Sequence, residues 1–217
     1  MTDYKTRRKI MVDTQIRPSD VTKFPIIDAF LSVPREKFVP DGNREAAYIG
    51  ENFLIGQNRV ILEPRTLAKL LDALNINNDE LVLDIGTGLG YSSAVISLLA
   101  EVVIAVEDDS SLASESEEIL SEIGADNVVV QVSKLEDGAP EHGPYDVIIL
   151  QGGVEKIPSS ILNQLKNGGR VGAIFVEEGL GTAKIGFKLN DKINWRYSFN
   201  AAAPVLPGFF KQKDFVL

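Results

Sequence analysis

The middle of the chain alternates short β-branched runs with helix-like stretches, and this alternation constrains the fold more than any other feature. Five runs predict strands: Glu80–Ile85, Val102–Glu107, Asn127–Val132, Val147–Gln151 and Arg170–Val176. Three stretches between them predict helices: Tyr91–Leu99, Leu112–Ile123 and Ser159–Leu165. Strands that alternate with helices imply right-handed crossovers and a parallel sheet covered on both faces. The sequence therefore predicts an α/β fold with a mostly parallel, doubly wound sheet.

The first 79 residues differ in character, because they are rich in turn residues and show no clear strand alternation. Apolar residues at helical spacing predict helices over Val21–Leu31 and Thr66–Leu74. We expect residues 1–79 to form a helical and irregular extension that packs on a core of residues 80–217. At the other end, Tyr197–Leu217 contains prolines and a Gly-Phe-Phe, and we expect antiparallel edge strands there.

Composition excludes several kinds of chemistry. The chain has 217 residues, no cysteine and a single histidine, His142, which we expect to be solvated. Disulfides, thiolate metal sites, cysteine nucleophiles and multi-histidine metal sites are therefore excluded. The net charge of −9 argues against nonspecific binding to nucleic acid or an anionic membrane. No apolar run could span a membrane, and no signal-peptide core follows the basic start. We expect a cytoplasmic, soluble protein, a monomer or weak dimer, without a metal.

A glycine-rich loop follows the first strand of the predicted sheet, with Gly86, Gly88 and Gly90 two residues apart and Tyr91 next. Glycine permits positive φ and close approach of a ligand to the backbone, and the following helix offers free N–H groups. A dinucleotide fingerprint needs a glycine where Tyr91 stands, and a phosphate-binding P-loop needs a Gly-Lys-Ser/Thr that is missing here. The G-x-G-x-G spacing with Asp84 before it is typical of S-adenosylmethionine (SAM) methyltransferases.

A second acidic residue, Glu107, ends the next predicted strand, 21 residues after Gly86. A carboxylate at that point can accept both ribose hydroxyls of a nucleoside. The alternative is that Glu107 only caps the following helix. With the loop at this distance, a nucleoside site is the better interpretation. The predicted cofactor-binding residues are Asp84, Ile85, Gly86, Thr87, Gly88, Gly90, Tyr91, Glu107 and Asp108.

Beyond the loop, most of the chain resembles the protein-L-isoaspartate O-methyltransferase family of protein-repair enzymes. The segments that carry the resemblance are Val33-Pro-Arg-Glu-Lys-Phe-Val39, Ile55-Gly56-Gln57 followed by Pro64, Leu83–Tyr91, Pro144–Ile148, Ile157-Pro158 and Gln164–Arg170. The resemblance implies a Rossmann-like class I SAM-dependent fold, SAM as donor with S-adenosylhomocysteine as product, and an isoaspartyl carboxylate of a protein or peptide as acceptor. Such a carboxylate has a pKa of about 4 and is ionised at neutral pH, so no general base is needed.

The acceptor segment departs from the family pattern. The family carries Thr-Ile-Ser-x-Pro after its Gly-Gln, and here the residues are Val60-Ile61-Leu62-Glu63-Pro64. A hydrogen bond to a charged group is worth about 1.5–3 kcal/mol, so loss of the serine would cost roughly 10- to 100-fold in rate. Arg59 and Arg65 could compensate by binding an anion, but we expect both to be solvated. The resemblance implies these acceptor-site candidates: Gln57, Val60, Ile61, Leu62, Pro64 and Gln151.

A second departure follows the third strand, where the family has an aspartate that accepts from the adenine amino group. That position falls within Ser133-Lys134-Leu135, which the resemblance adds to the cofactor-binding candidates. Lysine cannot accept a hydrogen bond. Lys134 and Leu62 together leave two alternatives to isoaspartyl methylation: a methyltransferase with a different acceptor, and a non-catalytic binding protein on the same fold.

Overall fold

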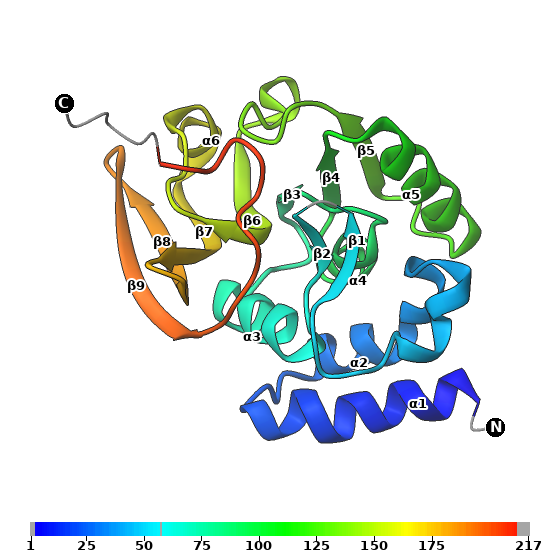
Figure 1. Ribbon diagram of the computed structural model, residues 1–217. Coiled ribbons are helices and arrows are strands. Elements are labelled where there is room, and N and C mark those ends of the chain that lie inside the picture. The colour runs from blue at the N-terminus through cyan, green and yellow to red at the C-terminus, as the bar shows by residue number, and fades with distance from the viewer. Residues whose placement is uncertain (1–2, 57, 212–217) are drawn as a thin grey trace.

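The computed structural model describes residues 3–56 and 58–211, and a seven-stranded sheet forms its centre (Figure 1). The strand order is β5-β4-β3-β6-β7-β8-β9, in which neighbours from β5 to β7 are parallel and β8 and β9 are antiparallel. The strands are β3 (Leu81–Ile85), β4 (Val102–Glu107), β5 (Val128–Val132), β6 (Tyr145–Val154), β7 (Leu165–Glu177), β8 (Leu180–Leu189) and β9 (Lys192–Asn200). The predicted α/β fold with a mostly parallel sheet is confirmed.

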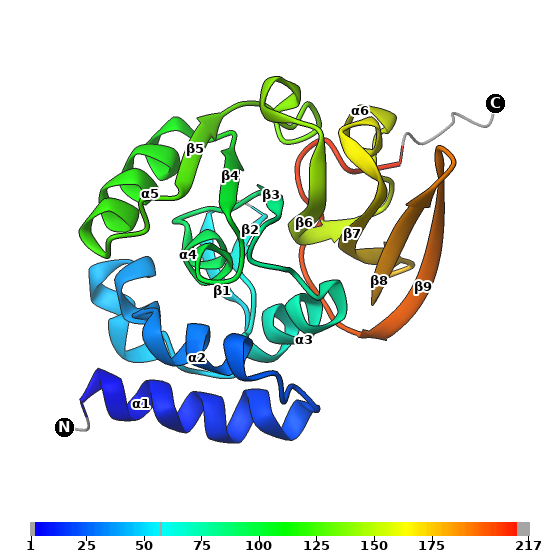
Figure 2. The ribbon, with the colours of Figure 1, turned by 180° about the vertical axis from the view of Figure 1, so that it is seen from behind.

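Six α-helices surround this sheet in the described part of the chain: α1 (Tyr4–Met11), α2 (Phe24–Ser32), α3 (Pro64–Leu74), α4 (Tyr91–Ser97), α5 (Ser110–Glu122) and α6 (Ser159–Asn163). The periodic stretches predicted as helices correspond to α2 through α6, with shifted ends. Helix α1 was not predicted. Its only strongly apolar residues, Ile10 and Met11, lie at its end, so it carries little helical periodicity. It lies along the outside of α2 in both views (Figures 1 and 2).

The two faces of the sheet bury different rows of side chains. Val82 of β3 is level with Val103 and Val147 on its neighbours, and all three belong to a cluster with side chains of α2 to α5. The next row, which includes Leu83, faces a second cluster with α6 and the C-terminal segment. Successive residues of a strand point to opposite faces, so near-continuous apolar strands fill both layers.

An antiparallel hairpin that the sequence did not predict, β1 (Phe53–Gly56) and β2 (Arg59–Ile61), precedes α3. It lies beside the carboxyl ends of β3 and β4 (Figure 1), and Ile55 and Arg59 contact the glycine loop there. The expectation that residues 1–79 lack strands is wrong. Strands of three and four residues are too short to give a readable alternation. The boundary at residue 79 stays a prediction, since one buried cluster includes residues from both sides of it.

The C-terminal edge differs from the expectation for Tyr197–Leu217. The antiparallel strands β8 and β9 begin earlier, and they meet at Asn190 and Asp191, which have φ of 49° and 61°. Two left-handed residues form the tight turn that suits a two-residue hairpin, and this Asn-Asp pair was the missed signal. After β9 the chain returns across β6, where Gly153 N donates to Pro204 O at 2.8 Å and Leu206 N donates to Gly153 O at 2.9 Å. Residues 212–217 lie outside the described part.

Candidate active site

The glycine loop joins β3 to α4 at the carboxyl edge of the sheet. Its three glycines have positive φ: 80° at Gly86, 59° at Gly88 and 91° at Gly90, which is also the N-cap of α4. Gly86 N donates to Val106 O of β4 at 2.8 Å. Because side chains rarely adopt such φ values, glycine is required for this path. The three glycines thus let the backbone turn tightly from β3 into α4.

Asp84 is buried at the end of β3, and its carboxylate is fully bonded within the protein. Oδ2 accepts from the hydroxyls of Ser92 and Ser93, each at 2.6 Å, and Oδ1 accepts from Gln151 Nε2 at 2.6 Å. Burial raises the pKa of Asp84, and the three hydrogen bonds counteract part of that rise. Asp84 therefore joins β3, α4 and β6 and fixes the shape of the loop.

Glu107 ends β4 and is buried between the loop and the hairpin. Its Oε2 accepts from Gly88 N at 2.7 Å, and its Oε1 accepts from the backbone N–H groups of Asp108 and Asp109 at 3.0 and 3.2 Å. The interpretation of Glu107 as a mere helix cap is wrong, because the side chain of Asp109 is the N-cap of α5. Burial raises the pKa of Glu107, and the nearby guanidinium of Arg59 opposes this.

Arg59 is the residue that sequence reasoning placed wrongly. It is only 5% exposed, not solvated, and its Nη2 forms an ion pair with Glu107 Oε2. Its Nη1 is buried without a hydrogen-bond partner, and its Nε lies 3.9 Å from Asp108 Oδ1. Arg65 is half-buried and lies 3.5 Å from Glu63. In the sequence, Arg59 is a basic residue just before an apolar segment, and this position alone does not show whether its side chain is buried or exposed.

Side chains of the hairpin fill the space that the glycines leave. A Cβ at Gly86 would lie 2.7 Å from Arg59 Nη1 and 3.3 Å from Leu206 Cδ2. A Cβ at Gly88 would collide with Ile55 Cδ1. The three side chains touch the loop where a ligand would have to approach it.

A cavity of about 480 Å³ opens between the hairpin and the start of α5, next to Arg59, the ion-pair partner of Glu107. Asp108 contributes an exposed carboxylate to it, and the remaining lining residues are Ile55, Gly56, Arg59, Asp109, Ser111, Leu112 and Pro207. Binding pockets for small molecules span a few hundred Å³, so this cavity is large enough for part of a nucleoside. The cavity extends the predicted donor site toward the protein surface.

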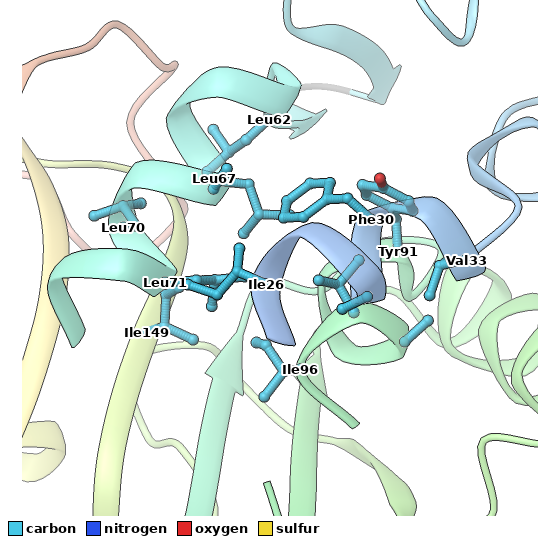
Figure 3. Close-up of a cluster of buried hydrophobic side chains, with 14 of the residues drawn as sticks. Ile26, Phe30, Val33, Leu62, Leu67, Leu70, Leu71, Tyr91, Ile96 and Ile149 are labelled. Carbon is cyan, nitrogen blue, oxygen red and sulfur yellow. The ribbon is translucent and has the colours of Figure 1, made fainter. Parts of the chain in front are cut away.

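The acceptor candidates converge on the loop but leave no room. Val60, Ile61 and Leu62 are 7%, 5% and 1% exposed. The cavity between them and the loop is only about 10 Å³, and its lining is Val60, Ile61, Leu62, Leu67, Thr87, Tyr91, Ser92 and Gln151. Figure 3 shows Leu62 among the buried side chains of Leu67, Phe30 and Tyr91. Pro64 begins α3, and Gln57 lies outside the described residues.

The remaining cofactor candidates divide between core and surface. Ile85 and Leu135 are fully buried, and Tyr91 packs edge-on against Phe30 and Phe38 with ring centroids 6.3 and 5.6 Å apart. Three others lie near the site: Thr87 Oγ1 is 2.7 Å from Ser93 Oγ, Ser133 N donates to Glu107 O at 3.1 Å, and Lys134 is exposed. His142 is exposed as expected.

Arg35, from the segment Val33–Val39, binds the backbone of the acceptor segment. It was not predicted as a site residue. It is fully buried, with Nε donating to Ala47 O at 2.7 Å and Nη2 to Leu62 O at 3.0 Å. Its guanidinium stacks on the ring of Tyr91, 4.6 Å from the centroid. Burial lowers the pKa of Arg35. This cation fixes the backbone of the acceptor segment.

A mostly parallel sheet with a glycine loop after β3 and a buried acid ending β4 is the arrangement of α/β proteins of the methyltransferase class. Two solved structures share the fold. A protein-L-isoaspartate O-methyltransferase gives a TM-score of 0.80 at 24% identity over 95% of this chain, which spans 66% of that longer chain. A Plasmodium falciparum protein described as the same enzyme, in complex with S-adenosylhomocysteine, gives 0.78 at 18% identity over 95% of this chain and 99% of that one.

Relatives by sequence identify the family. The protein-L-isoaspartate O-methyltransferase of Syntrophus aciditrophicus is 36% identical over 79% of this chain and 78% of its own, and that of Opitutus terrae is 35% identical over 76% and 70%. The model of the protein-L-isoaspartate (D-aspartate) O-methyltransferase family matches residues 6–195. The chain belongs to this family, which confirms the function expected from the resemblance: SAM-dependent O-methylation in protein repair.

The described residues include neither a metal-binding cluster nor a membrane-spanning helix. No group of three or more His, Asp or Glu side chains is arranged to hold a metal ion in the described part. None of the described helices is long and apolar enough to cross a membrane.

Proposed function

We propose that SAM binds at the carboxyl ends of β3 and β4 and that its methyl group goes to the carboxylate of an isoaspartyl residue in a protein or peptide. The buried Glu107 carboxylate, whose partner Arg59 lines a cavity of about 480 Å³, is the observation that carries this proposal. When bound, SAM supplies a methyl group on a positively charged sulfur that leaves as a neutral thioether. The residues that would hold it are the glycine loop and Glu107.

The donor groups fit a nucleoside. Glu107 already accepts from three backbone N–H groups, which hold its carboxylate in one orientation. The loop glycines leave room for close approach once Ile55 and Arg59 move aside. Lys134 is exposed and cannot accept from adenine, so the base would be recognised by backbone groups and by apolar contact.

The chemistry asks little of the protein beyond positioning. An acceptor carboxylate is ionised at neutral pH, so none of the residues around the loop has to remove a proton. Holding the two reactants in line can supply most of the acceleration. The apolar wall of Val60, Ile61 and Leu62 would exclude water from the reacting atoms.

Incubation with methyl-labelled SAM tests this function. An isoaspartyl peptide should acquire base-labile label, and the same peptide with ordinary aspartate is the matched control. Label no higher than in the aspartyl control would contradict the proposal.

A different acceptor is the second candidate, and the cavity of about 10 Å³ beside Leu62 favours it. Label that enters a component of a cell lysate but not the isoaspartyl peptide would support this alternative.

A further inference from the structure

Arg59 stands where the donor's ribose is expected. In the proposed donor site, the Glu107 carboxylate accepts from the ribose hydroxyls, yet here Oε2 already bonds to the guanidinium of Arg59. The Nη1 group of the same guanidinium lies against Gly86. One side chain thus occupies both the acceptor that a ribose needs and the space that a glycine provides.

This arrangement leaves the guanidinium poorly satisfied. Arg59 is 5% exposed, and neither its Nε nor its Nη1 has a hydrogen-bond partner. An arginine carries five N–H donors, and buried donors without acceptors cost free energy. The ion pair with Glu107 therefore holds Arg59 in place but leaves some of its N–H donors without acceptors. A second position of the side chain, with more acceptors or with water, could compete with the buried position.

Such a second position is close. Asp108 Oδ1 lies 3.9 Å from Arg59 Nε, and both residues line the cavity of about 480 Å³. Asp109, next to it, is committed to capping α5 through the N–H groups of Ser111 and Leu112. Asp108 is exposed and already forms an ion pair with Arg59 at this distance, so it can receive the guanidinium at the surface.

We propose that Arg59 is an internal competitor for the donor site: it covers Glu107 in the free protein and swings outward to Asp108 when the donor binds. This inference rests on the proposed donor site. Ile55 would move with it, because both side chains belong to the β1–β2 hairpin and both fill the space above the glycine loop. The hairpin thereby sets the affinity for the donor.

The effect on binding follows from the populations. When only a fraction of the protein has the site open, the apparent dissociation constant rises by the inverse of that fraction. Replacing Arg59 by a side chain that cannot pair with Glu107 should free the carboxylate for the ribose and tighten binding. Removing Asp108 should close it more often and weaken binding.

Calorimetric titration with S-adenosylhomocysteine, which needs no methyl acceptor, tests the inference. Arg59→Met keeps the length of the side chain and leaves Glu107 with its three backbone donors, so the fold should persist. Its dissociation constant should fall about tenfold or more. Arg17→Ala is the charge-matched control, since Arg17 is exposed and pairs with Asp13 at 3.2 Å, and its affinity should equal that of the wild type.

Asp108→Asn supplies an independent test in a protein whose fold is not at risk. It should weaken binding about three- to fivefold, and the loss should be smaller in the Arg59→Met background, because the part of the effect that acts through Arg59 is then absent. Equal or weaker binding by a folded Arg59→Met overturns the inference, as does an unchanged affinity of Asp108→Asn should Arg59→Met fail to fold. Absence of binding by wild type and variants alike would overturn the donor site itself.

Discussion

The donor side of the site is polar and lies at a cavity, whereas the acceptor side is apolar and closely packed. On the donor side, Arg59 pairs with Glu107 and lines a cavity of about 480 Å³. On the acceptor side, Val60, Ile61 and Leu62 pack into the core around a void of about 10 Å³. A ligand can replace one polar partner by another, but it cannot enter a close-packed apolar region without displacing it. The donor side can therefore open by a side-chain movement, whereas the acceptor side requires the packing to change.

The largest expected effect comes from Leu62→Ser. The sequence alone suggests that this change restores a hydroxyl and raises isoaspartyl activity. Because Leu62 is 1% exposed, the substitution should instead lower the free energy of unfolding by about 3–5 kcal/mol, through a cavity and a buried hydroxyl. Urea denaturation measures the loss, and Leu54→Ser on the 67% exposed Leu54 is the control with an expected change under about 0.5 kcal/mol.

Higher isoaspartyl activity per folded molecule of Leu62→Ser, with little loss of stability, would break the comparison. It would mean that the acceptor segment lies at a pocket and is not part of the core.

A smaller effect is expected from Gly88→Ala on the donor side. Gly88 has φ of 59° and faces Ile55, so alanine adds backbone strain and a collision, together about 2–4 kcal/mol. Gly124→Ala isolates the strain, since Gly124 has φ of 74° and open space around it, and should cost about 1 kcal/mol. Equal losses in thermal unfolding of the two variants would show that Ile55 yields freely and that the hairpin is already loose above the loop.

The smallest expected effect is the pH dependence of Asp84→Asn. Loss of hydrogen bonds from Ser92, Ser93 and Gln151 should cost about 1–3 kcal/mol. Burial raises the pKa of Asp84 in the folded protein above its usual unfolded value of about 3.9. Its contribution to stability is therefore complete below about pH 4 and is lost as the pH rises through the folded pKa.

Asparagine cannot titrate, so the stability difference between wild type and Asp84→Asn should shrink as the pH rises. Chemical denaturation at several pH values measures this difference. A difference that stays constant with pH would show that the loop is more hydrated than its burial implies.

Much of the fold could be predicted from local patterns. Strand β4 has the predicted bounds, and β3 and β5 differ by one residue at their starts, because each is a β-branched run bounded by turns. The glycine loop was found for a similar reason, since positive φ at Gly86, Gly88 and Gly90 leaves glycine as the suitable residue. The hairpins were missed. Strands β1 and β2 are too short to show an alternating pattern. The turn residues Asn190 and Asp191 indicate the β8–β9 hairpin, but the prediction did not include it.

The site residues show the same contrast between features set by local sequence and features set by distant contacts. Asp84 and Glu107 lie at the ends of β3 and β4, where the predicted strands placed them, and the structure adds that both are buried. Arg59 was expected in solvent and is buried, and Leu62 was expected at a pocket and lies in the core. Neither outcome depends on local sequence, because each is set by residues more than 40 positions away or by the packing of separate helices.

The sequence by itself determined the mostly parallel sheet, the glycine loop and the two acids at the ends of β3 and β4, because backbone conformation and strand periodicity act over a few neighbouring residues. Only the tertiary structure decided what faces those groups. The β1–β2 hairpin brings the guanidinium of Arg59 onto Glu107, and the core draws in Leu62. Burial and charge pairing are set by contacts between distant segments, and through them the donor side gained an internal competitor while the acceptor side lost its open space.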